Sequence, residues 1–264
     1  YAAPDQPLRQ TVLNDIHRGA GGKLVPFAGW ELPVEYTGGG GGGIFAEHKA
    51  VRAAAGLFDV SHMGVLEVVG PRAGAFLETA FTGCAPRLRC GEAPYSYMVD
   101  PRGVAFDDLY TYRLEPEKYM VVVNAANAER DEAWLNAVIS GEYQIDIADP
   151  AKQAPKPALF RNLRFAGADA LVEIAFQGPL AAKILAELAV LPADAATIMA
   201  MKINDVRRAT FNIEGVGPTP VILAGTGYTG EECGFEIFVH TDRVGALWKD
   251  ILARGKERGV RPCG

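Results

Sequence analysis

The stretch AGTGYTGEECGFEI, residues 224–237, decides between two fold classes. Its Gly225, Gly227 and Gly230 have the G-x-G-x-x-G spacing of a dinucleotide-binding turn. Such a turn needs a strand before it and, after it, a helix whose N-terminal amides face the pyrophosphate. The apolar TPVILA segment before the turn is suited to a strand, but residues 231–240 then alternate with the period of a second strand. The stretch therefore predicts a β-hairpin and argues against a dinucleotide site.

The bulk composition is that of a globular protein with a substantial core. The chain has 264 residues, of which 49% are hydrophobic, and a net charge of -6 at neutral pH. This length allows one large or two ordinary domains. The acidic balance, with both signs interspersed, argues against a nucleic-acid or membrane-surface partner. No apolar run reaches the length needed to span a bilayer.

Metal and nucleophile chemistry have little support in the sequence. The four cysteines form no C-x-x-C pair, and the four histidines show no metal-ligand spacing. We therefore expect reduced thiols and no metal site. His62, in the DVSHMG segment, invites a catalytic interpretation, but no sequence pattern marks a Ser or Cys as its nucleophile. A structural histidine is the favoured interpretation.

The order of predicted elements indicates an α+β fold. Residues 64–147 predict β-α-β-β-β-α-β, ending in a short strand at 143–147, which suggests a ferredoxin-like layer. A helix is predicted at 8–18, and the proline-rich stretch 149–157 is typical of a linker. The second half repeats a similar mixture of strands and helices. The six glycines at 38–43 carry no side-chain chemistry, so we assign them no function.

Two adjacent carboxylates interrupt an otherwise apolar strand. Asp107 and Asp108 must face opposite ways, because side chains alternate along a strand. Asp108 shares its face with Phe106, Tyr110 and Tyr112. A flat heteroaromatic ligand would find aromatic surfaces and a hydrogen-bonding carboxylate there. Asp108 is therefore the candidate for a buried, ligand-facing acid, while a solvated aspartate or one paired with an arginine stays open as the alternative.

Three further polar residues have an ordinary structural interpretation beside a functional one. Asn124 ends an apolar strand, where a turn or helix N-cap is the usual role. Glu236 lies between Phe235 and Ile237, so it either faces solvent on a half-exposed strand or acts in a site. Tyr228, at the glycine turn, is more typical of a packing tyrosine.

Several segments, taken in order, resemble one known family. These are GGKLVPFAGWELPVEY, EHKAVRAAAGLFDVSHMG, YSYMVD, DDLYTYRL, VVVNAANAERD, FQGP, GTGYTGEECGFEI and RPCG. Together they resemble the aminomethyltransferase (T-protein) family of the glycine cleavage system, from about residue 8 to the end. The resemblance implies a transfer that uses tetrahydrofolate and the lipoylated H-protein. The methylene of the aminomethyl-lipoyl arm passes to tetrahydrofolate, and ammonia and dihydrolipoyl H-protein are released.

The resemblance also implies the site residues. The family's catalytic aspartate is the second of the pair, Asp108, which the strand-face analysis also selects. The remaining implied residues are folate contacts at Tyr95, Asn124, Tyr228 and Glu236, and further pocket positions at Met63 and Tyr112. On this basis the glycines of the hairpin let it pass close to a ligand. The chain is one residue longer than the family pattern before Glu236, so a bulge at Cys233 is expected to shift that carboxylate.

The resemblance implies a domain arrangement and a compartment. Residues 1–59 with 150–264 are expected to form a folate-binding α+β domain, and 60–149 a ferredoxin-like domain that carries the Asp-Asp strand. The family's C-terminal β-barrel domain is expected to be absent from this chain. Kinship places the protein in the mitochondrial matrix, with the bacterial cytoplasm as the alternative.

Two related functions remain as alternatives. One is a non-transferase folate-binding protein that supports iron–sulfur cluster maintenance. Such relatives carry a cysteine-bearing signature in place of GYTGEECGFE, which counts against this alternative. The other is the folate domain of a flavin-dependent demethylating dehydrogenase, which would need a flavin-binding half from a partner chain.

Overall fold

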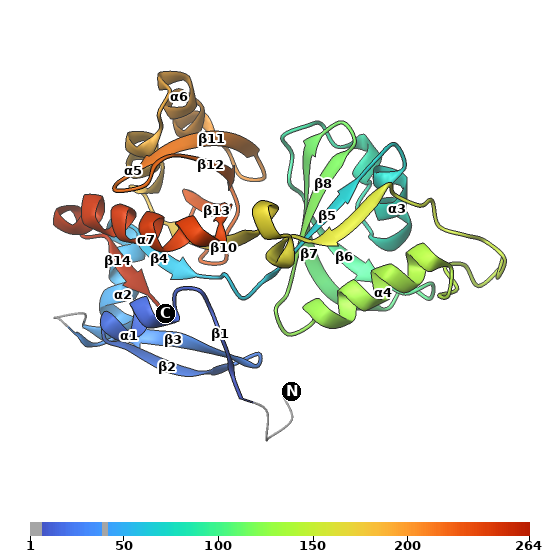
Figure 1. The fold of residues 1–264 in the computed structure, drawn as a ribbon, viewed down its shortest axis with the longest axis horizontal. Coiled ribbons are helices and arrows are strands. Elements are labelled where there is room, and N and C mark those ends of the chain that lie inside the picture. The colour runs from blue at the N-terminus through green and yellow to red at the C-terminus, as the bar shows by residue number, and fades with distance from the viewer. Residues whose placement is uncertain (1–6, 39–41) are drawn as a thin grey trace. The chain divides into compact units, whose positions relative to one another are not determined.

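The computed structural model describes residues 7–38 and 42–264 (Figure 1). The chain divides into two compact units, Tyr1–His62 with Leu171–Gly264, and Met63–Ala170. Each unit contains a β-sheet with helices, so the expected α+β class is confirmed. Residues 39–41 of the glycine run lie outside the described residues.

The first unit is built on a six-stranded sheet with the order β11-β12-β13-β10-β4-β14. All neighbouring strands are antiparallel except β14 and β4, which are parallel. The strands are β4 (Gly56–Asp59), β10 (Leu171–Gln177), β11 (Val206–Ile213), β12 (Gly217–Ala224), β13 (Gly234–His240) and β14 (Arg261–Cys263). The predicted hairpin is confirmed, because β12 pairs with β13 across the glycine turn.

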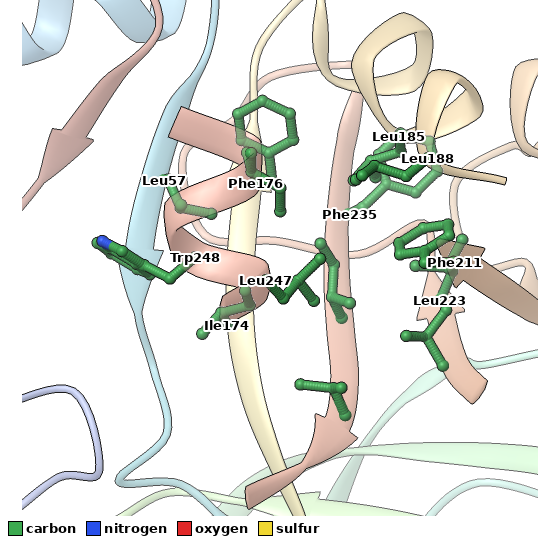
Figure 2. Packing of buried hydrophobic residues seen from close by; sticks show 14 of the residues in the cluster. Leu57, Ile174, Phe176, Leu185, Leu188, Phe211, Leu223, Phe235, Leu247 and Trp248 are labelled. Carbon is green, nitrogen blue, oxygen red and sulfur yellow. The ribbon is translucent and has the colours of Figure 1, made fainter. Parts of the chain in front are cut away.

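One face of this sheet carries the core of the first unit. Strand alternation places Ile174 and Phe176 on that face, where Figure 2 shows them near Leu247 and Trp248 of α7. Each fully buried side chain of this size contributes roughly 1.5–3 kcal/mol. The helices that contact the sheet or each other here are α5 (Ala181–Leu188), α6 (Pro192–Ala200) and α7 (Thr241–Gly255), followed by the 3-10 turn η5 (Lys256–Arg258).

A small three-stranded sheet precedes this core, with the order β1-β3-β2. Its strands are β1 (Arg9–Gln10), β2 (Gly22–Phe27) and β3 (Trp30–Tyr36), and its helices are α1 (Asn14–Gly19) and α2 (Gly43–Ala53). The predicted helix at 8–18 is therefore too long at its start. Residues 9–10 pair instead with Trp30 and Glu31 of β3, which holds them extended.

A buried polar network ties α1 to β3 and β4. His17 Nε2 lies 2.8 Å from Asp59 Oδ2, and His17 Nδ1 lies 2.7 Å from the Tyr36 hydroxyl. Thr11 Oγ1 also donates to Asp59 Oδ2 at 2.7 Å. The side chains of His17 and Asp59 are fully buried. Burial is the largest single effect and would raise the pKa of Asp59, but the hydrogen bond and charge of His17, together with the hydrogen bonds from Ser61 and Thr11, lower the pKa below its usual value.

The second unit is a five-stranded, wholly antiparallel sheet, cyan to yellow in Figure 1, with the order β6-β7-β8-β5-β9. Its strands are β5 (Gly64–Val69), β6 (Tyr95–Val99), β7 (Ala105–Glu115), β8 (Lys118–Val123) and β9 (Leu159–Asn162). Its helices are α3 (Ala73–Ala80) and α4 (Ala128–Ser140), with 3-10 turns η2 (Ala85–Arg87), η3 (Leu163–Phe165) and η4 (Gly167–Asp169). Both α-helices pack on one face, where Leu109 and Val121 meet Phe76 and Leu135.

The end of the second unit differs from the prediction. Residues 143–147 form no strand, because Tyr143 and Ile145 pack against the core and the Asp146 side chain accepts from the following amides in a turn. The edge strand that pairs with β5, on the side away from β8, is β9, which follows the linker-like stretch. Because β9 pairs with β5, residues 150–170 group with the second unit. The compact division therefore lies about 20 residues after the expected boundary.

Candidate active site around Asp108

Asp108 lies on the face of the five-stranded sheet that does not pack against α3 and α4. Its neighbour Leu109 points into the helix-covered core, and Asp108 pairs across the sheet with Tyr97. Cross-strand partners share a face, so this face carries four tyrosines around one carboxylate. They are Tyr95, Tyr97, Tyr110 and Tyr112, with neighbouring ring centroids 5.3 to 6.1 Å apart.

Two side chains fix the Asp108 carboxylate. The Tyr95 hydroxyl donates to Oδ2 at 2.8 Å, and Asn124 Nδ2 donates to Oδ1 at 3.0 Å. Hydrogen bonds to a charged acceptor are the stronger kind, and the bond to Asp108 raises the pKa of Tyr95 above its usual value. Tyr95 and Tyr97 are each 46% exposed. The carboxylate is therefore held in one orientation beside aromatic surfaces that a ligand can reach.

The buried member of the aspartate pair is Asp107, which corrects the expectation that Asp108 is the buried acid. Asp108 is only partly buried, whereas Asp107 is 7% exposed. Asp107 points toward the helix-covered face, where Asn124 and Asn127 supply its donors. Those donors make burial of its charge tolerable, since buried charges need hydrogen-bonding partners.

Asn124 links the two aspartates, a role that neither sequence interpretation included. Its Nδ2 lies 3.0 Å from Asp107 Oδ1 and 3.0 Å from Asp108 Oδ1. It does not cap α4, whose N-cap residue is Asn127. The backbone turn is present, because Asn127 N donates to Asn124 O at 2.9 Å. Only the pairing of strands β7 and β8 brings this amide to the Asp-Asp pair.

The two other predicted residues in the second unit are buried. Met63 is 8% exposed and Tyr112 is fully buried. Tyr112 lies on the Asp108 face, with its ring centroid 6.1 Å from that of Tyr110. The second unit thus brings together Tyr95, Asp108 and Asn124, with Tyr112 farther along the same face.

The hairpin residues Tyr228 and Glu236 belong to the first unit. Tyr228 is 57% exposed in the loop, and Glu236 is fully buried on β13, where its carboxylate accepts from the Thr226 hydroxyl. Glu236 pairs with Ala175 and Ala224 in an unbroken register. The extra residue is absorbed in the loop before β13, so the expected bulge at Cys233 is wrong and the position of Glu236 on its strand is regular.

The glycines of the hairpin make room for Gln177. A Cβ at Gly227 or Gly234 would collide with the Gln177 amide. That amide donates to the carbonyls of Thr226 at 3.1 Å and Phe235 at 3.3 Å, so it braces the loop from inside. The expectation that the hairpin glycines allow a ligand to approach is therefore corrected at Gly225 and Gly227, where Lys202 and Gln177 fill the space. It stays a prediction at Gly230, where an added Cβ would meet no atom within 4 Å.

Glu173 is a buried carboxyl that sequence reasoning missed. It lies on β10 on the same face as Glu236, since Ala175 is the cross-strand partner of Glu236. It is fully buried, and neither oxygen has a hydrogen-bond partner among the described residues. Burial, and then the charge of Glu236, raise the pKa of Glu173 well above 4.5. The signal in the sequence is a single acidic residue inside the apolar run LVEIAF.

Replacing Glu173 by Met is expected to stabilise the protein. The change removes two buried oxygens without partners and keeps the side-chain volume, so the free energy of unfolding should rise by roughly 1–3 kcal/mol. Because folding raises the pKa of Glu173, the wild-type protein loses stability as the pH rises above about 4.5. The stability gained by Glu173→Met should therefore grow with pH. Urea denaturation at two pH values measures the free energy of unfolding of the wild type and of Glu173→Met. The exposed Glu232→Met is the control, and a loss of stability in Glu173→Met would refute this assignment.

The described residues contain neither a metal-binding cluster nor a membrane-spanning helix. In residues 7–38 and 42–264, no group of three or more His, Cys, Asp or Glu side chains is arranged to hold a metal ion. No helix within the described ranges is long and apolar enough to cross a membrane. His62 is buried, with its ring edge-on to Phe27 at a centroid distance of 5.9 Å.

Comparison with known proteins identifies the family. The model of the GCVT N-terminal domain matches residues 13–264. This chain belongs to the GCVT N-terminal domain family. It is 37% identical over 262 residues to an aminomethyltransferase of Symbiobacterium thermophilum, and 39% identical over 257 residues to one of Alkaliphilus oremlandii. These alignments cover 98% and 97% of this chain.

A solved structure agrees with the GCVT assignment. The glycine cleavage system aminomethyltransferase T of Bartonella henselae matches with a TM-score of 0.73 and 31% identity over 97% of this chain. The resemblance to the glycine cleavage aminomethyltransferases is therefore confirmed. The GCVT chain spans 62% and 61% of the two curated relatives and 60% of the Bartonella chain.

The compartment expected from kinship is not supported. The curated relatives named above are bacterial. This agrees with the alternative of a bacterial cytoplasm and gives no support to the mitochondrial matrix.

Proposed function

We propose that this chain carries the tetrahydrofolate-dependent aminomethyl transfer of glycine cleavage. It moves the methylene of aminomethyl-lipoyl H-protein to tetrahydrofolate, and ammonia and dihydrolipoyl H-protein are released. The observation that carries this proposal is the Asp108 carboxylate, fixed by Tyr95 and Asn124 on a tyrosine-lined face. The names of the relatives, aminomethyltransferases and one of them of the glycine cleavage system, support aminomethyl transfer.

The residues present fit a folate. A reduced pterin is flat and carries N–H donors along one edge, which suits aromatic surfaces and carboxylate acceptors. Tyr95 and Tyr97 offer partly exposed rings beside Asp108. In the first unit, Glu236 is a buried carboxylate with a hydroxyl donor already in place. We assign folate contacts to Tyr95, Asn124, Tyr228 and Glu236, with Met63 and Tyr112 as further pocket positions.

Asp108 is the residue to which we assign catalysis. Tetrahydrofolate, when bound, supplies the nitrogens that accept the one-carbon unit. The fixed Asp108 carboxylate would orient the N–H groups of its ligand and stabilise positive charge that develops at the transferred carbon. Its two hydrogen bonds pre-organise it, so little reorganisation accompanies the reaction. We carry over folate binding to the first unit and the catalytic strand to the second unit as part of this proposal.

The test is a titration of the chain with tetrahydrofolate, followed by incubation with aminomethyl-lipoyl H-protein. We expect saturable folate binding and ammonia release that depends on both folate and H-protein. Folate binding without ammonia release would favour the non-transferase alternative. Absence of folate binding would contradict the proposal outright.

A further inference from the structure

The loop that carries Tyr228 is restrained by two side chains of the first unit. It covers residues 225–233, between β12 and β13, and contains Gly225, Gly227 and Gly230. Glycine loses more conformational freedom than any other residue when it is ordered, so such a loop is costly to fix in one conformation. A ligand that requires one loop conformation binds more weakly when others are populated. Side chains that restrain the loop therefore strengthen ligand binding.

Thr229, the residue after Tyr228, is where the two restraints meet. Its hydroxyl donates to Gln177 Oε1 at 3.1 Å, and its carbonyl accepts from the guanidinium of Arg52 on α2 at 2.9 Å. The Thr229 hydroxyl also accepts from the backbone amide of Glu231 at 3.4 Å. The Arg52 guanidinium forms an ion pair with the Glu231 carboxylate as well. Thr229 is therefore fixed through its side chain by a buried amide and through its backbone by a guanidinium.

The two restraining residues come from parts of the first unit that are joined to each other. Gly178, which follows Gln177, lies against the end of α2. A Cβ added at Gly178 would meet the carbonyl oxygens of Val51 and Ala54 at 2.6 and 2.7 Å. The amide of Leu180 donates to Ala54 O at 2.9 Å. The end of β10 and the last turn of α2 therefore form a common base from which the loop is restrained.

Gln177 also acts on the buried carboxylate of Glu236, through Thr226. Its Nε2 donates to Thr226 O at 3.1 Å, and the Thr226 hydroxyl donates to Glu236 Oε2. Gln177 is 1% exposed, so water does not replace its hydrogen bonds. By fixing the backbone of Thr226, Gln177 fixes the donor that orients Glu236. Supporting hydrogen bonds of this kind hold ligand-binding groups in place.

We propose that Arg52 and Gln177 are positioning residues that hold the hairpin in its folate-binding conformation. Both fix the residue after Tyr228, and Gln177 also sets the donor on Glu236. The proposal rests on the folate contacts assigned to Tyr228 and Glu236. Catalysis is assigned to Asp108 and not to the hairpin, so loss of either restraint should weaken folate binding and leave kcat at saturating folate nearly unchanged.

The first test is calorimetric titration of tetrahydrofolate into Arg52→Met and a matched control, Arg258→Met. Arg258 is also a partly exposed arginine of the first unit, and it pairs at 2.7 Å with Glu187 of α5. The Kd should rise about three- to tenfold in Arg52→Met, because a smaller fraction of the loop is in the binding conformation. The Kd of Arg258→Met should stay within about twofold of wild type. An equally small change in Arg52→Met overturns the proposal.

Gln177→Met is the second variant. Methionine keeps the length of the side chain but removes its hydrogen bonds to Thr226 and Thr229. The Kd for tetrahydrofolate should rise about tenfold or more, with kcat at saturating folate within about twofold of wild type. A fall in kcat with an unchanged Kd overturns the proposal. If this buried variant does not fold, Arg52→Met decides, since the side chain of Arg52 is 45% exposed.

Hydrogen–deuterium exchange without folate measures the restraint itself. The amides of residues 226–233 should exchange faster in Arg52→Met than in wild type, whereas Arg258→Met should match wild type. Unchanged exchange in Arg52→Met also overturns the proposal. Failure of the wild type to bind tetrahydrofolate is a different outcome. It refutes the proposed function, and the folate role of the hairpin with it, while the exchange result stands.

Discussion

Asp108→Asn should reduce kcat for methylene transfer by about 10²–10³-fold, the usual effect of removing one pre-organised electrostatic group. Asparagine keeps the shape of the side chain and an oxygen for the Tyr95 hydroxyl, but it removes the charge that we assign to stabilising the transferred carbon. The KM for tetrahydrofolate should change much less than kcat, since the lost interaction strengthens in the transition state. Steady-state assays at varied folate concentration measure both parameters.

The control for this variant is Asp15→Asn on the exposed side of α1. Asp15→Asn should retain wild-type kcat and KM, and both variants should give the melting curve of a folded protein. A kcat for Asp108→Asn within about twofold of wild type would show that the charge of Asp108 does not drive the reaction.

His17→Leu should lower the free energy of unfolding by about 1.5–3 kcal/mol, because it removes a hydrogen-bonding partner from the buried Asp59 carboxylate. Among the described residues, the change leaves the buried Asp59 carboxylate with the donors Thr11 and Ser61. It also leaves the Tyr36 hydroxyl without its contact to His17 Nδ1. Chemical denaturation followed by tryptophan fluorescence measures the loss, because Trp248 packs on His17 at a centroid distance of 5.2 Å.

The pH dependence gives this second prediction a sign. In the wild type, the lowered pKa of Asp59 adds stability above about 3.8 that is lost as the pH falls below this value. Without His17, burial dominates and raises the pKa of Asp59, so the stability of the variant falls as the pH rises. The gap between the two proteins should therefore be wider at pH 8 than at pH 5. His48→Leu, at an exposed position of α2, should change stability little at either pH.

The parts of the structure that the sequence predicted correctly depend on local patterns. Alternation along 104–114 places Asp107 and Asp108 on opposite faces, and alternation after the glycine turn predicts β13. The pattern does not say which face is covered by helices, so it cannot tell which aspartate is buried. Here α4 covers the face of the sheet on which Asp107 lies. Asn124 and Asn127, which precede this helix, donate hydrogen bonds to Asp107.

The parts that the sequence did not predict depend on contacts between distant residues. Gln177 explains Gly227 and Gly234, but 50 or more residues separate it from either glycine, and only strand pairing brings them together. Likewise β9 pairs with β5 after a gap of about 90 residues, which periodicity cannot show. The resemblance to a family points to Asp108, and the pairing of β7 with β8 then shows the link through Asn124 to Asp107.

A single-turnover experiment follows the transferred carbon itself and so tests the proposed methylene transfer. Wild-type chain is mixed with tetrahydrofolate and H-protein whose aminomethyl carbon is isotopically labelled, and the label is followed by mass spectrometry. We expect the label to leave the lipoyl arm and appear on the folate as ammonia is released, and Asp108→Asn to slow this step by about 10²–10³-fold. Label that stays on the H-protein while tetrahydrofolate is bound would contradict this transfer.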